Sequence, residues 1–132
     1  MSRLSRSNLK PMNKERIENN LIVKLSFEFG VAITQFCDEL HNEKRFVIAN
    51  QLLRAGLSIG SNVWEAQNAE SVADFIHKLK IACKEADEST FFLLIVAEVY
   101  QKQEVEKLLS DLESISKILN KIITSTKRKE SK

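Results

Sequence analysis

Hydrophobic residues recur every three or four positions over most of the chain, and this spacing predicts four long α-helices. They are expected at residues 20–42, 46–67, 71–100 and 104–126. The connections between them are short and polar, so successive helices are expected to turn back on one another. The pattern predicts an all-α fold, an antiparallel four-helix bundle with up-down-up-down connections.

The two ends of the chain lack this periodicity and define the expected domain organisation. Residues 1–18 contain Pro11, several Ser and Asn residues and scattered charge, a composition typical of an extended or disordered basic arm. Residues 19–126 form the predicted bundle, and residues 127–132 form a short basic tail. With 132 residues, three glycines and one proline, the chain fits a single helical domain.

Positive charge is concentrated at these two ends, although the net charge of the chain is only +2. Residues 1–16 hold five Lys or Arg and one Glu, and residues 117–132 hold six and one, so the stretch between them is acidic overall. Basic arms can neutralise the phosphates of a nucleic acid, and the alternative is a pair of solvated tails. In an oligomer the arms would be repeated around one rim, which makes the two interpretations about equally good.

The sequence also bears on the compartment of the protein. The first residues lack the apolar core of a signal peptide, and no window approaches the length of a membrane span. Cys37 and Cys83 lie among apolar residues without a CxxC pattern, which favours buried thiols over a disulfide. We therefore expect a cytoplasmic protein that does not contact a membrane.

Residues 51–90 carry a polar stripe beside the apolar one on two consecutive helices. Its members recur at steps of three or four residues, which places them on one face of each helix. They are Arg54, Ser58, Asn62, Glu65, Glu85 and Glu88. In an antiparallel pair Arg54 can face Glu85 or Glu88. One interpretation is a ligand groove, and the favoured one is a buried or interfacial hydrogen-bonded network that fixes helix register and assembly.

The same stretch resembles the signature of a known protein family. Its elements are SIGSNVWEA at residues 58–66, Asp74-Phe75, and ACKEADES at residues 82–89. They are similar to those of the small bacterial four-helix bundle proteins encoded within intervening sequences of 23S rRNA genes, often labelled ribosomal-protein-like. Ser89 and Phe92 stand where the family pattern has Thr and Trp. The resemblance covers residues 21–119.

This resemblance implies a homo-oligomeric bundle, a pentamer in known relatives, with no known enzymatic activity. A related branch serves as the accessory protein of diversity-generating retroelements, in which a basic barrel is associated with nucleic acid and a reverse transcriptase. The label "ribosomal" reflects gene location in this family, so it implies no ribosomal role.

The end of the third predicted helix has no polar face over residues 91–97. A helix that is apolar all round must be covered on all sides, and the neighbours in a lone bundle leave one side open. The pattern therefore favours a homo-oligomer independently of the resemblance. The expected subunit contacts are Phe27, Trp64, Phe91, Phe92, Ile95 and Val96.

No catalytic, cofactor-binding or metal-binding residues are expected. The pairs Asp38/His41 and Asp74/His77 imitate half of a di-iron motif, but they fall at opposite ends of the predicted bundle. About 20 intervening helical residues would separate them by roughly 30 Å. Ser58 and Ser61, which lie near the carboxylates of the polar stripe, have no His within reach, and this argues against acid–base chemistry there.

The favoured function is a non-catalytic module that binds RNA, DNA or a nucleoprotein through basic residues with low sequence specificity. Its expected contacts are Arg3, Arg6, Lys10, Lys78, Lys80, Lys84, Lys127, Arg128 and Lys129. The alternative is a structural scaffold that presents grooves to another protein. Salt separates the two, because binding through several phosphates weakens steeply as salt rises.

Overall fold

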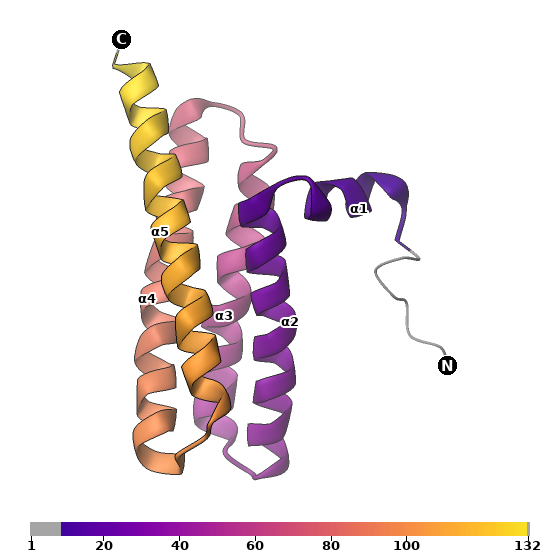
Figure 1. Ribbon diagram of the computed structural model, residues 1–132, viewed down its shortest axis with the longest axis vertical. Coiled ribbons are helices and arrows are strands. Elements are labelled where there is room, and N and C mark those ends of the chain that lie inside the picture. Colours follow the sequence, from indigo (N-terminus) through magenta and orange to yellow (C-terminus); the bar gives the residue numbers. More distant parts are fainter. Residues whose placement is uncertain (1–8, 132) are drawn as a thin grey trace.

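The computed structural model describes residues 9–131, which form five α-helices and no strand (Figure 1). The helices are α1 (Pro11–Glu18), α2 (Leu21–Asn42), α3 (Phe46–Ala66), α4 (Val72–Tyr100) and α5 (Glu104–Glu130). The all-α prediction is confirmed. Helices α2 to α5 occupy the four stretches in which the hydrophobic spacing predicts helices, whereas α1 is an additional helix.

The four long helices lie side by side, and the chain reverses direction at each connection between them (Figure 1). α2 packs against α3 and α5, and α4 packs against the same two helices. α2 and α4 are therefore diagonal to each other, and their outer faces lie on opposite sides of the molecule.

The boundaries of α2 and α4 follow from local capping. Asn20 Oδ1 accepts a hydrogen bond from the Val23 N–H at 3.4 Å, and Ser71 Oγ accepts one from the Asp74 N–H at 3.0 Å. α4 ends where Gln101 adopts a left-handed conformation with φ 54°. Both ends of α4 are thus determined by neighbouring residues. The position of these ends determines which residues of α4 lie beside α3 and α5.

Over residues 11–18, α1 corrects the expectation of an extended or disordered arm, whose residues 1–8 lie outside the described part of the chain. Pro11 occupies the first turn, where its missing N–H costs no hydrogen bond. Ile17 is only 2% exposed and anchors the helix. α1 projects from the bundle beside the start of α2 and contacts that helix (Figure 1). A short helix held by one apolar side chain shows no hydrophobic period, which is why the sequence pattern misses it.

α5 continues to Glu130, so residues 127–130 are helical and do not form a separate tail. Lys127, Arg128 and Lys129 occupy its last turn. Cations in this position interact favourably with the negative end of the helix macrodipole. The basic end of the chain is therefore held on a regular helix next to the bundle.

Gly60 allows α2 and α3 to approach each other closely, whereas the approach near Gly30 does not depend on glycine. A Cβ added at Gly60 would lie 3.2 Å from the carbonyl oxygen of Ser26, closer than most real contacts. A Cβ added at Gly30 would meet a methyl group of Leu57 at 3.5 Å, which is an ordinary contact. The packing of α2 on α3 therefore requires glycine at position 60 and tolerates a larger residue at position 30.

The apolar end of α4 is only partly covered by the bundle. Val96 is fully buried and Phe92 is half-buried, whereas Phe91, Leu94 and Ile95 are exposed at 58%, 52% and 40%. The assignment of Val96 to a subunit contact is wrong, because its own chain covers it. None of the helices in residues 9–131 is long and apolar enough to cross a membrane.

Cys37 and Cys83 are free thiols, the first buried and the second half-buried. Burial raises the pKa of Cys37 to about 12 and also raises the pKa of Cys83. Both thiols are therefore protonated and weakly nucleophilic near neutral pH.

Candidate nucleic-acid interface

The outer face of α4 changes character halfway along the helix. Its exposed residues recur every three or four positions, and they are Lys80, Lys84, Asp87, Phe91 and Leu94. The first half of this stripe is basic and the second half is apolar. Because four residues advance about 6 Å along a helix axis, Lys80 and Lys84 form a short row of positive charge.

The C-terminal end of α5 lies against the basic half of α4. The thiol of Cys83 lies 3.9 Å from Asn120 Oδ1. Lys127 lies two turns beyond Asn120 on the same helix. Interaction with the Lys80 side chain, including charge repulsion, lowers the pKa of Lys127. Exposed cations from two distant parts of the sequence therefore lie on neighbouring helices, α4 and α5.

We refer to the exposed cations on these parts of the two helices as the α4–α5 basic cluster. Its members are Lys80, Lys84, Lys127 and Arg128. Within residues 9–131 none of them forms an ion pair with a carboxylate, although several other lysines do. Lys129, the next residue along α5, is also exposed and unpaired within that part of the chain. The cluster thus presents positive charge that its own carboxylates leave uncompensated.

The remaining residues of the expected basic rim are placed elsewhere. Lys78 forms an ion pair with Glu65 of α3 at 3.4 Å, so its charge is compensated and it does not join the cluster. Lys10 precedes α1, which projects to one side of the bundle while the end of α5 lies on the other (Figure 1). Arg3 and Arg6 lie outside the residues that the structure describes. The sequence analysis expected these basic residues on a single rim. Those that the structure describes lie in separate places within one chain.

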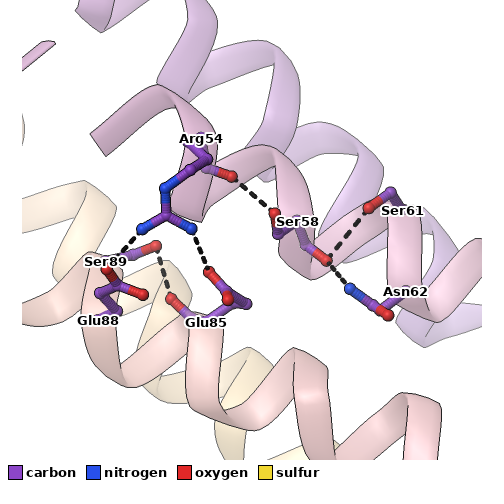
Figure 2. A network of polar contacts seen from close by, with 7 residues as sticks. All are labelled: Arg54, Ser58, Ser61, Asn62, Glu85, Glu88 and Ser89. Carbon is purple, nitrogen blue, oxygen red and sulfur yellow. Dashed lines mark hydrogen bonds and ion pairs between the residues drawn. The ribbon is translucent and has the colours of Figure 1, made fainter. Parts of the chain in front are cut away.

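The polar network around Arg54 joins α3 to α4 (Figure 2). The Arg54 guanidinium donates to Glu85 at 3.4 Å and to Glu88 at 2.5 Å. Ser58 Oγ donates to the carbonyl oxygen of Arg54, and Asn62 Nδ2 donates to that of Ser58, both at 2.8 Å. These two side chains bond to their own helix, and the Arg54 side chain is 49% exposed. The network is therefore not buried within one chain, contrary to one form of the expectation.

We expect Arg54→Ala to lower the free energy of unfolding by less than about 1 kcal/mol, because exposed ion pairs contribute little. Urea unfolding of Arg54→Ala, Glu88→Gln and the double variant measures this, with a coupling energy of at most about 1 kcal/mol. A loss above about 3 kcal/mol would contradict the expectation and indicate a desolvated pair.

A groove of about 630 Å³ lies along the outer side of α2 and α3. It is lined by Phe27, Gly30, Val31, Leu57 and Trp64, among others. Phe27, Val31 and Leu57 are exposed at 38%, 44% and 43%. This hollow apolar face is separate from the apolar half of the α4 stripe, because α2 and α4 are diagonal in the bundle.

Trp64 has a partner that the sequence analysis missed. The Arg16 guanidinium of α1 lies 3.6 Å from the centroid of the Trp64 ring and donates a hydrogen bond to the Trp64 carbonyl oxygen at 3.0 Å. The expected subunit contact of Trp64 therefore competes with a contact inside its own chain. A cation–aromatic pair between distant residues has no periodic signal, so nothing in the sequence marks it.

A carboxyl pair at the other end of the bundle was also missed. A hydrogen bond with Glu104 raises the pKa of Glu39, whereas a backbone hydrogen bond at the start of α5 lowers the pKa of Glu104. The two carboxyls thus differ in proton affinity and link the end of α2 to the start of α5. Among the residues described, no group of three His, Cys, Asp or Glu side chains is arranged to hold a metal ion.

The four long helices match a known protein family. The model of the 23S rRNA-intervening sequence protein family matches residues 18–121. The chain belongs to this family. The match confirms the family expected from residues 58–89, and it covers α2, α3, α4 and most of α5. The last turns of α5, with Lys127 and Arg128, lie beyond the part of this intervening-sequence protein that matches.

A solved structure resembles this intervening-sequence protein closely. It is the crystal structure of a protein with unknown function from the S23 ribosomal protein family of Bacteroides thetaiotaomicron VPI-5482. The two chains are 41% identical, with a TM-score of 0.74 over 77% of this chain and 97% of the other. No curated protein matches the sequence. These comparisons support the fold and name no ligand.

Proposed function

We propose that this member of the intervening-sequence protein family is a non-catalytic homo-oligomer that binds nucleic acid with low sequence specificity. The observation that carries the proposal is the α4–α5 basic cluster, whose cations have no carboxylate partner among residues 9–131. Backbone phosphates supply the missing negative charge, and the counterions released on binding add to the affinity. Both RNA and DNA offer such phosphates.

The low sequence specificity follows from the side chains in the cluster. Lysine contacts to phosphates position a nucleic acid without reading its bases. Base stacking needs exposed aromatic rings, and in residues 9–131 these are Phe27, Phe46 and Phe91. Phe27 and Phe46 lie on α2 and α3, and Phe91 lies in the apolar half of α4. None of them is in the cluster.

The homo-oligomer is supported by two apolar faces that stay partly exposed in the part of the chain described, residues 9–131. Phe91, Leu94 and Ile95 form an exposed ridge on α4, and Phe27 and Leu57 border the groove on α2 and α3. Contiguous exposed apolar surface is typical of interaction sites. In a head-to-tail contact, the ridge of one copy would lie in the groove of the next. Such contacts form a closed ring if the rotation between neighbouring copies allows it. Five subunits would match the known relatives.

The same groove favours a second candidate function, a scaffold for another protein. An apolar groove lined by Phe27, Val31 and Leu57 can accept the apolar face of a foreign helix as well as that of a second copy. Such binding would depend little on salt, because it would rest on apolar contact rather than on counterion release.

The nucleic-acid proposal is tested by fluorescence anisotropy with labelled RNA and DNA duplexes at about 50 mM and about 200 mM salt. If about four phosphates are neutralised, the affinity should fall roughly 100-fold between the two concentrations. The matched control is Lys107→Gln, which removes a charge already paired with Asp111 at 3.1 Å and should bind like the unaltered protein. Absence of binding to both duplexes at low salt would reject the proposal and favour the scaffold function instead.

A further inference from the structure

Arg16 connects α1 to the C-terminal end of α3. Its guanidinium lies 3.6 Å from the centroid of the Trp64 ring and donates to the Trp64 carbonyl oxygen at 3.0 Å. This carbonyl belongs to the last turn of α3, where the negative end of the helix macrodipole favours a cation. One side chain of α1 therefore contacts both the ring and the backbone of Trp64, and it covers one face of the ring.

Trp64 also belongs to the apolar groove on α2 and α3. From α3 the groove is lined by Leu57, Gly60, Ser61 and Trp64, so Trp64 marks the end of the groove nearest the C-terminus of that helix. α1 projects from the bundle beside the start of α2 (Figure 1). The ring face that Arg16 covers is unavailable to a helix of another copy that enters the groove.

α1 is held by few contacts, so it can leave the bundle without unfolding it. A helix of eight residues is not stable alone in water, and α1 is therefore helical only while it is docked. Within α1, Ile17 is the one buried residue. Asn20 stays with the bundle, because its side chain caps α2 and donates to Gln67 at 3.1 Å. Release of α1 therefore loses the burial of Ile17 and the contacts of Arg16, while α2 keeps its cap.

We infer that α1 is an autoinhibitory segment: docked through Arg16 it withholds Trp64 from the subunit contact, and its release strengthens assembly. Such regulation rests on the homo-oligomer of the proposed function. Docking of α1 and binding of a second copy compete for Trp64, so the apparent affinity between copies falls as the docked fraction of α1 rises. The family match begins at residue 18, so almost all of α1 precedes the matched part of the chain.

The test compares the full chain with Arg16→Ala by light scattering over a series of protein concentrations. The change removes a cation–aromatic contact and a hydrogen bond from a charged donor, so α1 should be released from most chains. The dissociation constant between copies should then fall roughly tenfold. An unchanged or larger dissociation constant would overturn the inference, because α1 would then be neutral or part of the subunit contact. Circular dichroism checks that the bundle is kept.

The fluorescence of Trp64 reports on the same event directly, because it is the single tryptophan of the chain. At protein concentrations below the dissociation constant, acrylamide should quench Trp64 more strongly in Arg16→Ala than in the unaltered protein. At high concentration the quenching in Arg16→Ala should decrease, as a second copy covers the ring. Equal quenching of the two proteins at low concentration would show that Arg16 does not shield the ring, and this result would also overturn the inference.

Lys14→Ala is the matched control on the same helix. It removes the same charge from an exposed side chain of α1 and leaves the contact between Arg16 and Trp64 in place. Its dissociation constant and its acrylamide quenching should equal those of the unaltered protein. An equal effect of Lys14→Ala and Arg16→Ala would mean that only the charge of α1 matters, which contradicts a specific contact at Trp64.

The same measurements separate failure of the autoinhibition from failure of the proposed homo-oligomer. If the unaltered protein and Arg16→Ala assemble equally strongly, the autoinhibition fails and the homo-oligomer stands. If the unaltered protein stays a monomer while Arg16→Ala assembles, both stand and the docked α1 blocks assembly completely. If neither protein assembles at any concentration, both fail.

Discussion

Replacing Gly60 with valine is expected to lower the free energy of unfolding by about 3 kcal/mol, at the upper end of the usual cost of overpacking. A Cβ at this position would lie 3.2 Å from the backbone carbonyl oxygen of Ser26, which cannot move aside as a side chain could. The methyl groups of valine would push α3 away from α2. Urea unfolding followed by circular dichroism measures the loss.

Gly30→Ala is the matched control for this change. Its Cβ would meet a methyl group of Leu57 at 3.5 Å, so the substitution should fit without strain. Alanine also favours the helix over glycine, and the expected gain in unfolding free energy is about 0.5–1 kcal/mol. If Gly60→Val were as stable as the unaltered protein, the close approach of α2 and α3 at Ser26 would not be a requirement of the fold.

Phe91→Glu is expected to dissociate the oligomer while leaving the bundle folded. The Phe91 side chain is 58% exposed in one chain, so the charged replacement disturbs little of the monomer. In the proposed assembly it would bury an unpaired carboxylate in an apolar groove, which costs several kcal/mol per contact. Light scattering should report a mass near the 15.1 kDa of one chain in place of a multiple of it.

Val72→Glu is the control for this experiment. It introduces the same charge on the same helix, but at the first residue of α4, where a carboxylate is favourable. Its mass should equal that of the unaltered protein. If Phe91→Glu also keeps that mass, the exposed ridge on α4 is not a subunit contact. Phe92 is a poorer probe, because it is half-buried in its own bundle and its replacement would disturb folding as well.

The polar stripe on α3 and α4 shows what the spacing of residues in the sequence can predict about a contact and what it cannot. The spacing of Arg54, Glu85 and Glu88 was sufficient to expect their contact, because antiparallel neighbours joined by a short turn leave few alternatives. It did not indicate whether the contact is buried. Exposure depends on what lies over the pair, and the Arg54 side chain proves to be 49% exposed in one chain.

The basic residues show the opposite case. Lys78, Lys80 and Lys84 are close in the sequence and look equivalent, yet Lys78 is neutralised by Glu65 while the other two remain unpaired in the part of the chain described. Two residues along a helix turn the side chain by about 200°. Which of these lysines meets a carboxylate is therefore decided by the neighbouring helix and not by local pattern.

The sequence by itself determined the all-α class, the positions of the four long helices and the family, because helical period, capping residues and signature motifs are local properties. Only the tertiary structure decided that α1 stacks Arg16 on Trp64, that α5 carries its cations as a helix to Glu130, and that α5 brings Asn120 next to Cys83. The physical reason is that these contacts join residues far apart in the chain. Their partners are set by the rotation and register of packed helices, which depend on close approaches such as that of Gly60 to Ser26.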